Sequence, residues 1–170
     1  ARLVQQISTS GVSEVFVSDC EFAGARFQGV WHATATPTVV PTLYVNGVSL
    51  NGAQSFQSSS FPFKLRGTNI TIRAALVTGF LNCYGAVSYD IRLRNLDLNG
   101  ANLFVNTTGT ITLSGDETVR ANVTTVARAD GASFYNTNAA AGTLGAAGMV
   151  DCVGTASGSW KRRGDYSLTY

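Results

Sequence analysis

Alternation of apolar and polar side chains at every second residue is the feature that most restricts how this chain folds. In the segment TNITIRAALV, Ile70, Ile72 and Leu76 fall on one face of an extended strand, and Arg73 falls on the other. Side chains alternate in this way along a β-strand. No segment has a helical periodicity, so the sequence predicts an all-β protein with little or no helix.

The alternation changes phase inside the segment SYDIRLRNLDLNG. The apolar positions follow the phase of Leu93 and then continue in the phase of Leu96. An extra residue in a strand reverses which face the following side chains occupy. The sequence therefore predicts a β-bulge near Arg94 and Asn95.

Asn-Gly pairs separate several of these apolar runs. They occur at Asn46-Gly47, Asn51-Gly52 and Asn99-Gly100. Asn-Gly adopts positive φ at both central positions of a tight turn, which favours a β-hairpin. Strands separated by such turns are typical of sandwiches and jelly rolls. We therefore expect one antiparallel β-sandwich or jelly-roll-like domain of roughly ten strands over residues 1–170, with no internal repeat or domain boundary apparent.

The composition indicates a folded domain with an uncharged polar surface. Hydrophobic residues make up 45% of the chain and charged residues only 13%, whereas Thr, Ser, Asn and Gly together account for 63 of 170 residues. The net charge of +2 is too small for a nucleic-acid-binding surface. No apolar run reaches the length of about 18 residues that crosses a bilayer, so neither a nucleic acid nor a membrane is an expected partner.

Three cysteines and a single histidine limit metal and redox chemistry. Cys20, Cys83 and Cys152 form no CxxC motif, and His32 alone cannot complete a zinc site with them. The favoured interpretation is three buried, reduced cysteines, and the alternative is one disulfide with a free thiol. The start ARLVQQIST has no export-signal pattern, so we expect synthesis without export, no metal and no cofactor.

Catalytic arrangements find little support in the sequence. A Ser-His-Asp or Cys-His site would depend on His32, and no GxSxG motif accompanies it. Two close acidic pairs, Asp19 with Glu21 and Asp116 with Glu117, have the residue types that glycoside hydrolysis requires, but ten scattered acids produce such pairs by chance. We therefore expect that the chain is not an enzyme and that it has no catalytic residues.

Arginines occupy the outward phase of several expected strands. If these strands are neighbours, the arginines form either an ordinary solvated sheet face or a positive stripe that meets an acidic protein surface. The arginines concerned are Arg66, Arg73, Arg92, Arg94, Arg120 and Arg128.

Two segments interrupt the alternation. Residues 52–63 (GAQSFQSSSFPF) read as a polar loop with three phenylalanines, and residues 136–150 (NTNAAAGTLGAAGMV) are nearly all small. Small side chains bury little area against the entropy of ordering. Residues 136–150 are therefore interpreted as a long loop or, alternatively, as an arm that orders against a neighbouring subunit.

The tripeptide Arg163-Gly164-Asp165 has the sequence that integrins recognise. It lies beside a basic run and before a resumed alternation in DYSLTY. Gly followed by Asp is common turn chemistry, so the tripeptide is interpreted as a turn.

These exclusions favour a structural or assembly protein, and a bacteriophage virion component such as a capsid decoration, cement or tail protein is the leading hypothesis. Such a protein is made in the host cytoplasm and then joins the virion. Its expected partners are further copies of itself, in a symmetric homo-oligomer such as a trimer, and a larger protein shell or tail. The candidate interface residues are Phe56, Phe61, Phe63, Leu144, Met149, Trp160, Arg162, Arg163, Asp165 and Tyr166.

Two alternatives remain open from the sequence. One is a carbohydrate-binding module or lectin that binds a glycan through an exposed aromatic residue such as Trp31, Trp160 or Tyr166. The other is an extracellular or cell-surface adhesin or pilus subunit.

Overall fold

The chain folds entirely into β-structure in a computed structural model that describes residues 2–7, 11–24, 27–52, 55–74, 79–116, 118–122, 132–137, 147–153 and 160–169. No helix occurs in these ranges, which confirms the expected all-β class. The strands are β1 (Arg2–Gln6), β2 (Glu14–Ala23), β3 (Gly29–Ala33), β4 (Thr42–Asn51), β5 (Gln57–Ser59), β6 (Lys64–Ala74), β7 (Leu81–Cys83), β8 (Ser88–Asn102), β9 (Phe104–Thr107), β10 (Thr110–Ser114), β11 (Val119–Asn122), β12 (Ser133–Asn136), β13 (Gly148–Cys152), β14 (Trp160–Arg162) and β15 (Asp165–Thr169).

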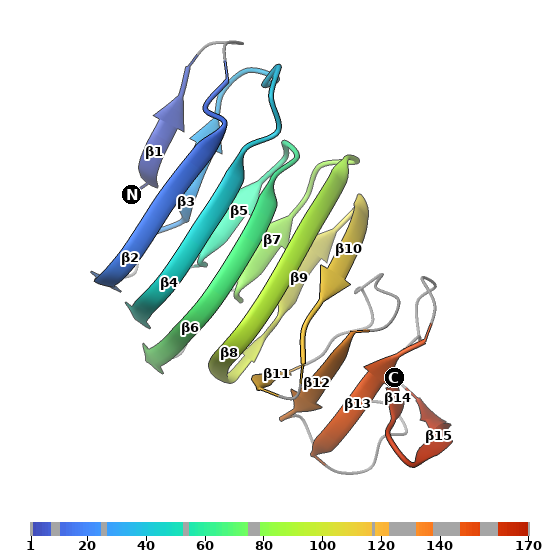
Figure 1. Cartoon of the computed structure of the whole chain (residues 1–170). Helices are drawn as coiled ribbons and strands as arrows, with labels where there is room; N and C mark the ends of the chain where they lie inside the picture. The colour runs from blue at the N-terminus through green and yellow to red at the C-terminus, as the bar shows by residue number, and fades with distance from the viewer. Residues whose placement is uncertain are drawn as a thin grey trace.

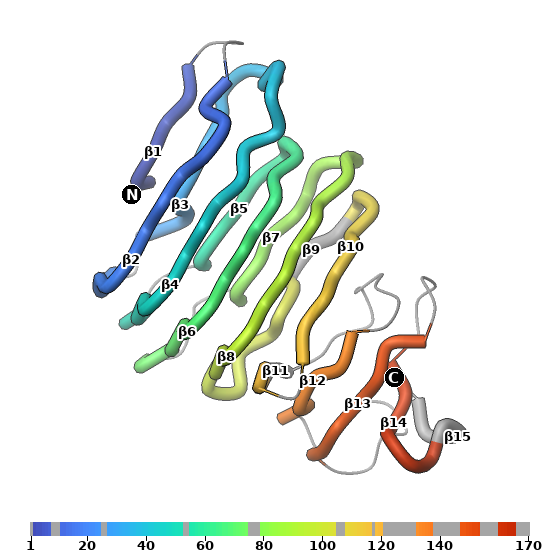
Figure 2. Tube along the Cα trace, in the orientation of Figure 1, coloured from blue at the N-terminus to red at the C-terminus, as the bar shows by residue number. Residues whose placement is uncertain are grey.

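Successive strands from β2 to β9 alternate between two sheets, so the chain winds as a β-solenoid (Figure 1). The smaller sheet has the order β1-β3-β5-β7-β9. The larger sheet has the order β2-β4-β6-β8-β11-β12-β13-β14-β15, and β10 pairs with β8 beside that path. Figure 2 shows the trace passing repeatedly from the layer of long strands to the layer of short ones.

Most neighbouring strands run parallel, so the prediction of an antiparallel sandwich or jelly roll is wrong for the main body of the fold. The pairs β2–β4, β4–β6, β6–β8 and β8–β10 are all parallel. Antiparallel pairing is found between β3 and β5 and along β12-β13-β14-β15. Parallel sheets covered by helices on both faces have continuous apolar strands. Here the outer face is solvated, and the resulting alternation resembles that of an antiparallel sheet.

Inward side chains stack in columns from one coil to the next. The residues of one column are separated by 28, 22, 26 and 22 positions, and all are buried. These unequal coil lengths explain why the structural repeat is not apparent in the sequence. The residues of this column are Val15, Leu43, Leu65, Ile91 and Leu113.

The predicted phase change in β8 is confirmed and recurs on the neighbouring strands. Asn95 has a φ of 48°, and the aligned residues Asn69, Gly47 and Asp19 have φ values of 54°, 66° and 50°. The offset between paired residues of β6 and β8 is 26 positions on both sides of Asn95, so the predicted β-bulge is not present between these strands. Instead, one left-handed residue in each strand reverses the phase in register. Four coils therefore bend at the same level and keep their apolar residues inward on both sides of the bend.

The Asn-Gly pairs do not form the predicted hairpins. Asn46-Gly47 lies inside β4 at this bend, and Asn99-Gly100 lies near the end of β8 with φ values of 46° and 77°. Gly52 directly follows β4 with a φ of 74°. The positive φ that suits a hairpin turn also suits a bulge or a corner between two sheets, so the residue pair does not determine the direction of the following strand.

The core lies between the two sheets and contains several of the aromatic residues. Phe56 and Phe80 stack with ring centroids 5.0 Å apart, and Phe134 packs against Trp160 at 5.3 Å. Phe56 precedes β5, so residues 52–63 are not simply a polar loop: they include a strand of the smaller sheet and two wholly buried phenylalanines.

Candidate binding groove on the outer face of the larger sheet

The parallel register aligns outward side chains in rows across the larger sheet. Residues that are far apart in sequence become neighbours on adjacent strands in this way. One row crosses β2, β4, β6, β8 and β10 and consists of Phe16, Tyr44, Arg66, Arg92 and Ser114.

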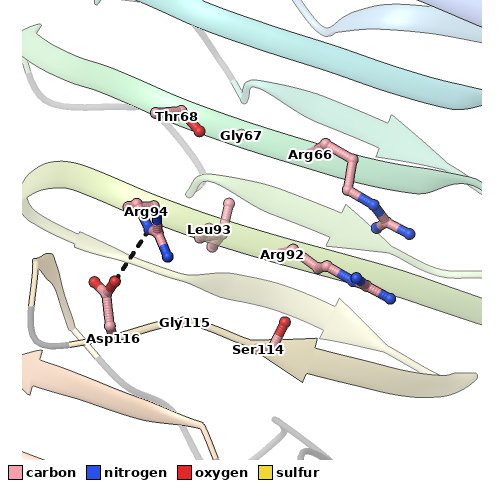
Figure 3. Close-up of a pocket in the computed structure, with 9 residues that line it drawn as sticks. All are labelled: Arg66, Gly67, Thr68, Arg92, Leu93, Arg94, Ser114, Gly115 and Asp116. Atoms are coloured by element: carbon pink, nitrogen blue, oxygen red, sulfur yellow. Dashed lines mark ion pairs between the residues drawn. The ribbon is translucent and has the colours of Figure 1, made fainter.

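A hollow of about 440 Å³ opens on this face over β6, β8 and the end of β10, and we call it the arginine groove (Figure 3). It lies where the partner of β8 changes from β10, whose last paired residue is Ser114, to β11, which starts at Val119. The groove is lined by Arg66, Gly67, Thr68, Arg92, Leu93, Arg94, Ser114, Gly115 and Asp116.

Gly115 permits the chain to leave the sheet at the end of the groove. A Cβ atom at this position would collide with the ring of Phe134 and would come within 3.3 Å of the Leu93 carbonyl oxygen. Only glycine therefore fits between this core ring and β8 without displacement, and the following residue, Asp116, is held at the groove.

Ion pairs fix the base of the groove but leave two arginines largely in solvent. Arg66 pairs with Asp90, and Arg92 places its Nε 3.6 Å from an Asp90 oxygen. Arg94 places its Nε 3.3 Å from Asp116. The side chains of Arg92 and Arg94 are 64% and 74% exposed, so water screens these pairs and they contribute little to stability.

Asp116 is held ionised by its neighbours. The Thr118 hydroxyl donates a hydrogen bond to the Asp116 carboxylate and is the largest cause of the lowered pKa of Asp116. The Thr118 backbone N–H, at 3.0 Å, and Arg94 lower this pKa further, and partial burial opposes them. A charged Asp116 therefore stays beside Arg94 over the neutral pH range.

A second hollow of about 380 Å³ continues the groove toward β2 and shares Arg66 and Thr68 with it. Its outer wall is the pair Phe16 and Tyr44, whose rings stack with centroids 4.8 Å apart and planes 8° apart. Phe16 is 71% exposed and Tyr44 is 37% exposed. The second hollow is lined by Phe16, Val17, Ser18, Tyr44, Val45, Asn46, Arg66 and Thr68.

The structure brings three of the expected arginines, Arg66, Arg92 and Arg94, to one site, where Asp90 and Asp116 balance part of their charge. Outside the groove, Arg73 pairs with Glu21 and Arg120 with Asp97. These arginines therefore form a face of alternating charges rather than an uncompensated positive stripe. Arg128 lies outside the described residues.

Several predicted interface residues are not on the surface. Phe56 and Phe63 have no exposed area, and Trp160 is 1% exposed against the ring of Phe134. Trp31 is also buried, so neither tryptophan can serve as a sugar platform. The strands near these residues are too short for the alternation of apolar and polar side chains to distinguish a buried aromatic residue from an exposed one.

The structure describes only some of the remaining residues of the predicted interface. Phe61 and Met149 are half-buried, and Leu144 and the side chain of Tyr166 lie outside the described residues. Most of the small-residue segment, 138–146, also lies outside them. Its flanks are paired, because Asn136 lies opposite Gly148 in the β12–β13 ladder.

Arg163-Gly164-Asp165 spans the connection between β14 and β15, in agreement with the turn interpretation. Gly164 has a φ of 89°, and Arg162 lies opposite Asp165 in the β14–β15 ladder. Arg163 is bound to β13: its Nη2 lies 2.7 Å from Asp151, and its N–H donates to the Met149 carbonyl. The arginine of the tripeptide is therefore held by the fold itself.

Groups considered for catalysis are dispersed. His32 is half-buried on β3, and burial, followed by the charge of Arg2, lowers its pKa. Glu21 accepts hydrogen bonds from Ser49 and Asn51 rather than facing Asp19 across a cleft. Across the described ranges, no three His, Cys, Asp or Glu side chains cluster as a metal site would require, and no helix there is long and apolar enough to cross a membrane.

The three cysteines form no disulfide, as the favoured interpretation expected, but not all of them are buried. Cys83 and Cys152 are buried, and Cys20 is half-buried. Burial raises the pKa of Cys83 to about 12. A protonated thiol in the core is a weak nucleophile and a weak metal ligand.

Sequence reasoning missed the Phe16–Tyr44 pair. Phe16 lies between the buried residues Val15 and Val17, so its outward phase was the available signal. Its partner Tyr44 is similarly placed between Leu43 and Val45. Their pairing required the β2–β4 register, which the sequence does not state.

Comparison with known proteins identifies no relative. No family model matches the chain, and neither a curated protein nor a solved structure matches it. The functional argument therefore depends on the geometry described above.

Proposed function

We propose that the chain is a non-enzymatic structural protein that assembles with other protein subunits through the end of the solenoid formed by β1 and β2. The proposed setting is a bacteriophage virion, in which the chain decorates or cements a capsid or forms part of a tail. Its partner is a second copy, in a closed symmetric oligomer such as a trimer, or a subunit of the larger shell or tail. The Ser/Thr/Asn/Gly-rich composition supports a structural role. The reduced cysteines support synthesis in the host cytoplasm.

The observation that carries this proposal is the edge of the larger sheet at β2. This strand is ten residues long and, within the described part of the chain, pairs only with β4. An edge strand presents backbone donors and acceptors that another strand can use. The outer edge of β2 therefore offers a template on which a further parallel or antiparallel strand can be added.

Side chains at this end support the same role. One face of the Phe16 ring stacks on Tyr44, and the residue remains 71% exposed because no described strand follows β2 in the sheet order. Leu3 on β1 and Ile7 directly after it are 50% and 77% exposed. Figure 1 places β1 and β2 at the same end of the molecule. Apolar side chains beside an open sheet edge are characteristic of a surface that a protein partner covers.

Size-exclusion chromatography with light scattering tests this proposal, with and without reductant. The wild-type chain is expected to form an oligomer that reductant does not dissociate. Phe16→Lys places a charge where a further strand would stack and is expected to give monomers. Val153→Lys, a matched apolar-to-lysine change at a half-exposed residue after β13, should leave the oligomer intact. A monomeric wild-type chain, or equal effects of both substitutions, would contradict assembly through this edge.

A further inference from the structure

We infer that the arginine groove and the adjoining Phe16–Tyr44 hollow bind an acidic glycan, a chain of pyranose rings bearing carboxylate groups. This role goes beyond assembly. Its arginines lie on β6 and β8, away from the proposed subunit contact at the β2 edge, and Phe16 is the residue that both surfaces share. Three observations carry the inference: available guanidinium donors, an aromatic wall in line with them, and the pairing of β6 and β8 on both sides.

The guanidinium groups of Arg92 and Arg94 are positioned to bind a carboxylate. Each faces its protein carboxylate through Nε, at 3.6 and 3.3 Å. Their Nη groups have no hydrogen-bond partner among the described residues, and both side chains project from β8 (Figure 3). Arginine binds carboxylates in a planar two-point geometry. Three arginines, Arg66, Arg92 and Arg94, face two aspartates, Asp90 and Asp116, so one positive charge is in excess. This excess favours an anionic ligand group.

The groove has the length and lining that suit a linked chain of sugars. From β8 to β2 is three strand spacings, or about 14 Å, and the two hollows share Arg66 and Thr68 along this path. Hydroxyl groups of Thr68 and Ser114 line it, and the exposed ring of Tyr44 adds an apolar surface. A pyranose ring presents hydroxyl groups at its rim and C–H groups on its faces, so it complements both kinds of surface.

A peptide or a nucleic acid suits the groove less well. Both β6 and β8 have neighbours on either side. β10 pairs only with β8 among the described strands, but it contributes only Ser114 to the groove, so a peptide finds little free strand edge to extend there. A nucleic acid would bring a phosphate at each nucleotide past Asp90 and Asp116, which lie beside the arginines. The alternating charges suit spaced carboxylates better than a dense row of phosphates.

Isothermal titration with a galacturonate hexamer and an oligomannuronate tests the inference, with maltohexaose as the neutral probe. At least one acidic oligosaccharide should bind, and maltohexaose at least tenfold more weakly. Arg92→Gln and Arg94→Gln should each weaken acidic binding about tenfold or more, because each removes charge-assisted hydrogen bonds. Arg73→Gln is the matched control: its side chain is 64% exposed and pairs with Glu21 at 3.3 Å on the same sheet, outside the groove.

Three results would overturn the inference. The first is that neither acidic oligosaccharide binds at millimolar concentration. The second is that Arg73→Gln weakens binding as much as Arg94→Gln, which would indicate a general charge effect. The third is that a glutamate hexapeptide binds as well as the acidic sugars and competes with them, which would indicate a surface for acidic proteins. Circular dichroism of each variant verifies that the fold is retained.

Discussion

The side chain of Gln57 replaces a missing strand ladder in the smaller sheet, and its removal is expected to destabilise the whole solenoid. β3 and β5 are paired only at Gly29 and Gln57. Beyond this point, the Gln57 Oε1 accepts hydrogen bonds from the N–H groups of Val30 and Trp31 at 3.0 and 3.2 Å, and Nε2 donates to the Trp31 carbonyl at 2.7 Å. Gln57 has no exposed area, so water cannot take its place.

Gln57→Met keeps the length of the side chain and removes all three hydrogen bonds. A buried backbone group without a partner costs about 1–3 kcal/mol, so three such groups cost about 6 kcal/mol. Burying a thioether in place of an amide offsets roughly 2 kcal/mol of this loss. The expected net decrease in the free energy of unfolding is therefore about 4 kcal/mol, which corresponds to a fall of about 8–16 °C in Tm for a domain of this size.

Urea and thermal unfolding followed by circular dichroism measure this difference. Gln5→Met is the matched control, because Gln5 is exposed on β1 and an exposed substitution changes stability by about 0.5 kcal/mol or less. If Gln57→Met lowers the free energy of unfolding by less than about 1 kcal/mol, the amide does not substitute for a ladder and the reasoning fails.

Two further predictions concern the bend and the core. Asn95 has a φ of 48°, a left-handed conformation that a β-branched residue adopts poorly. Asn95→Val should therefore lower the free energy of unfolding, measured by urea titration, by about 1–2 kcal/mol more than Asn95→Gly does. Equal losses in the two variants would show that the left-handed backbone is not the cause. Burial raises the pKa of Cys83 to about 12, and burial followed by the neighbouring Cys83 raises the pKa of Tyr89 to about 12. The folded state therefore keeps protons that the unfolded state releases, and the free energy of unfolding should fall from about pH 9 to about pH 12, by up to about 1.4 kcal/mol per pH unit for each group. Cys83→Ala should make this fall shallower in pH-dependent urea titrations, and an unchanged slope would contradict the assignment to Cys83.

Local properties of the chain were predictable from the sequence because they depend on neighbouring residues. The strand character of residues around Ile70 and Ile72 and the phase change at Asn95 follow from the phase of apolar side chains within a few positions. The turn at Gly164 likewise follows from local residue types. Such features are fixed by which side chains face inward, and a single strand carries that information.

The pairing of strands was not predictable from the sequence. The alternation of apolar and polar residues shows which face of a strand is buried, but it does not show which strand lies next to it or in which direction that strand runs. The Asn46-Gly47 pair illustrates the difficulty: its positive φ serves a bend within β4 instead of a hairpin. The aromatics of residues 52–63 show a second limit. A strand of three residues, Gln57–Ser59, is too short to display a period, so the buried Phe56 and Phe63 read as loop residues.

The candidate groove illustrates why a site on a solenoid is harder to recognise than a motif. Arg66, Arg92 and Asp116 come from three coils and are separated by 26 and 24 positions, and the coils themselves differ in length. Only the register places them together, and the same register stacks Leu65 on Ile91 in the core. A one-residue slip between β6 and β8 would move the arginines inward and the apolar residues outward. The hydrophobic core therefore specifies the groove: any substitution that shifts the register to repack the core would also dismantle the outer face.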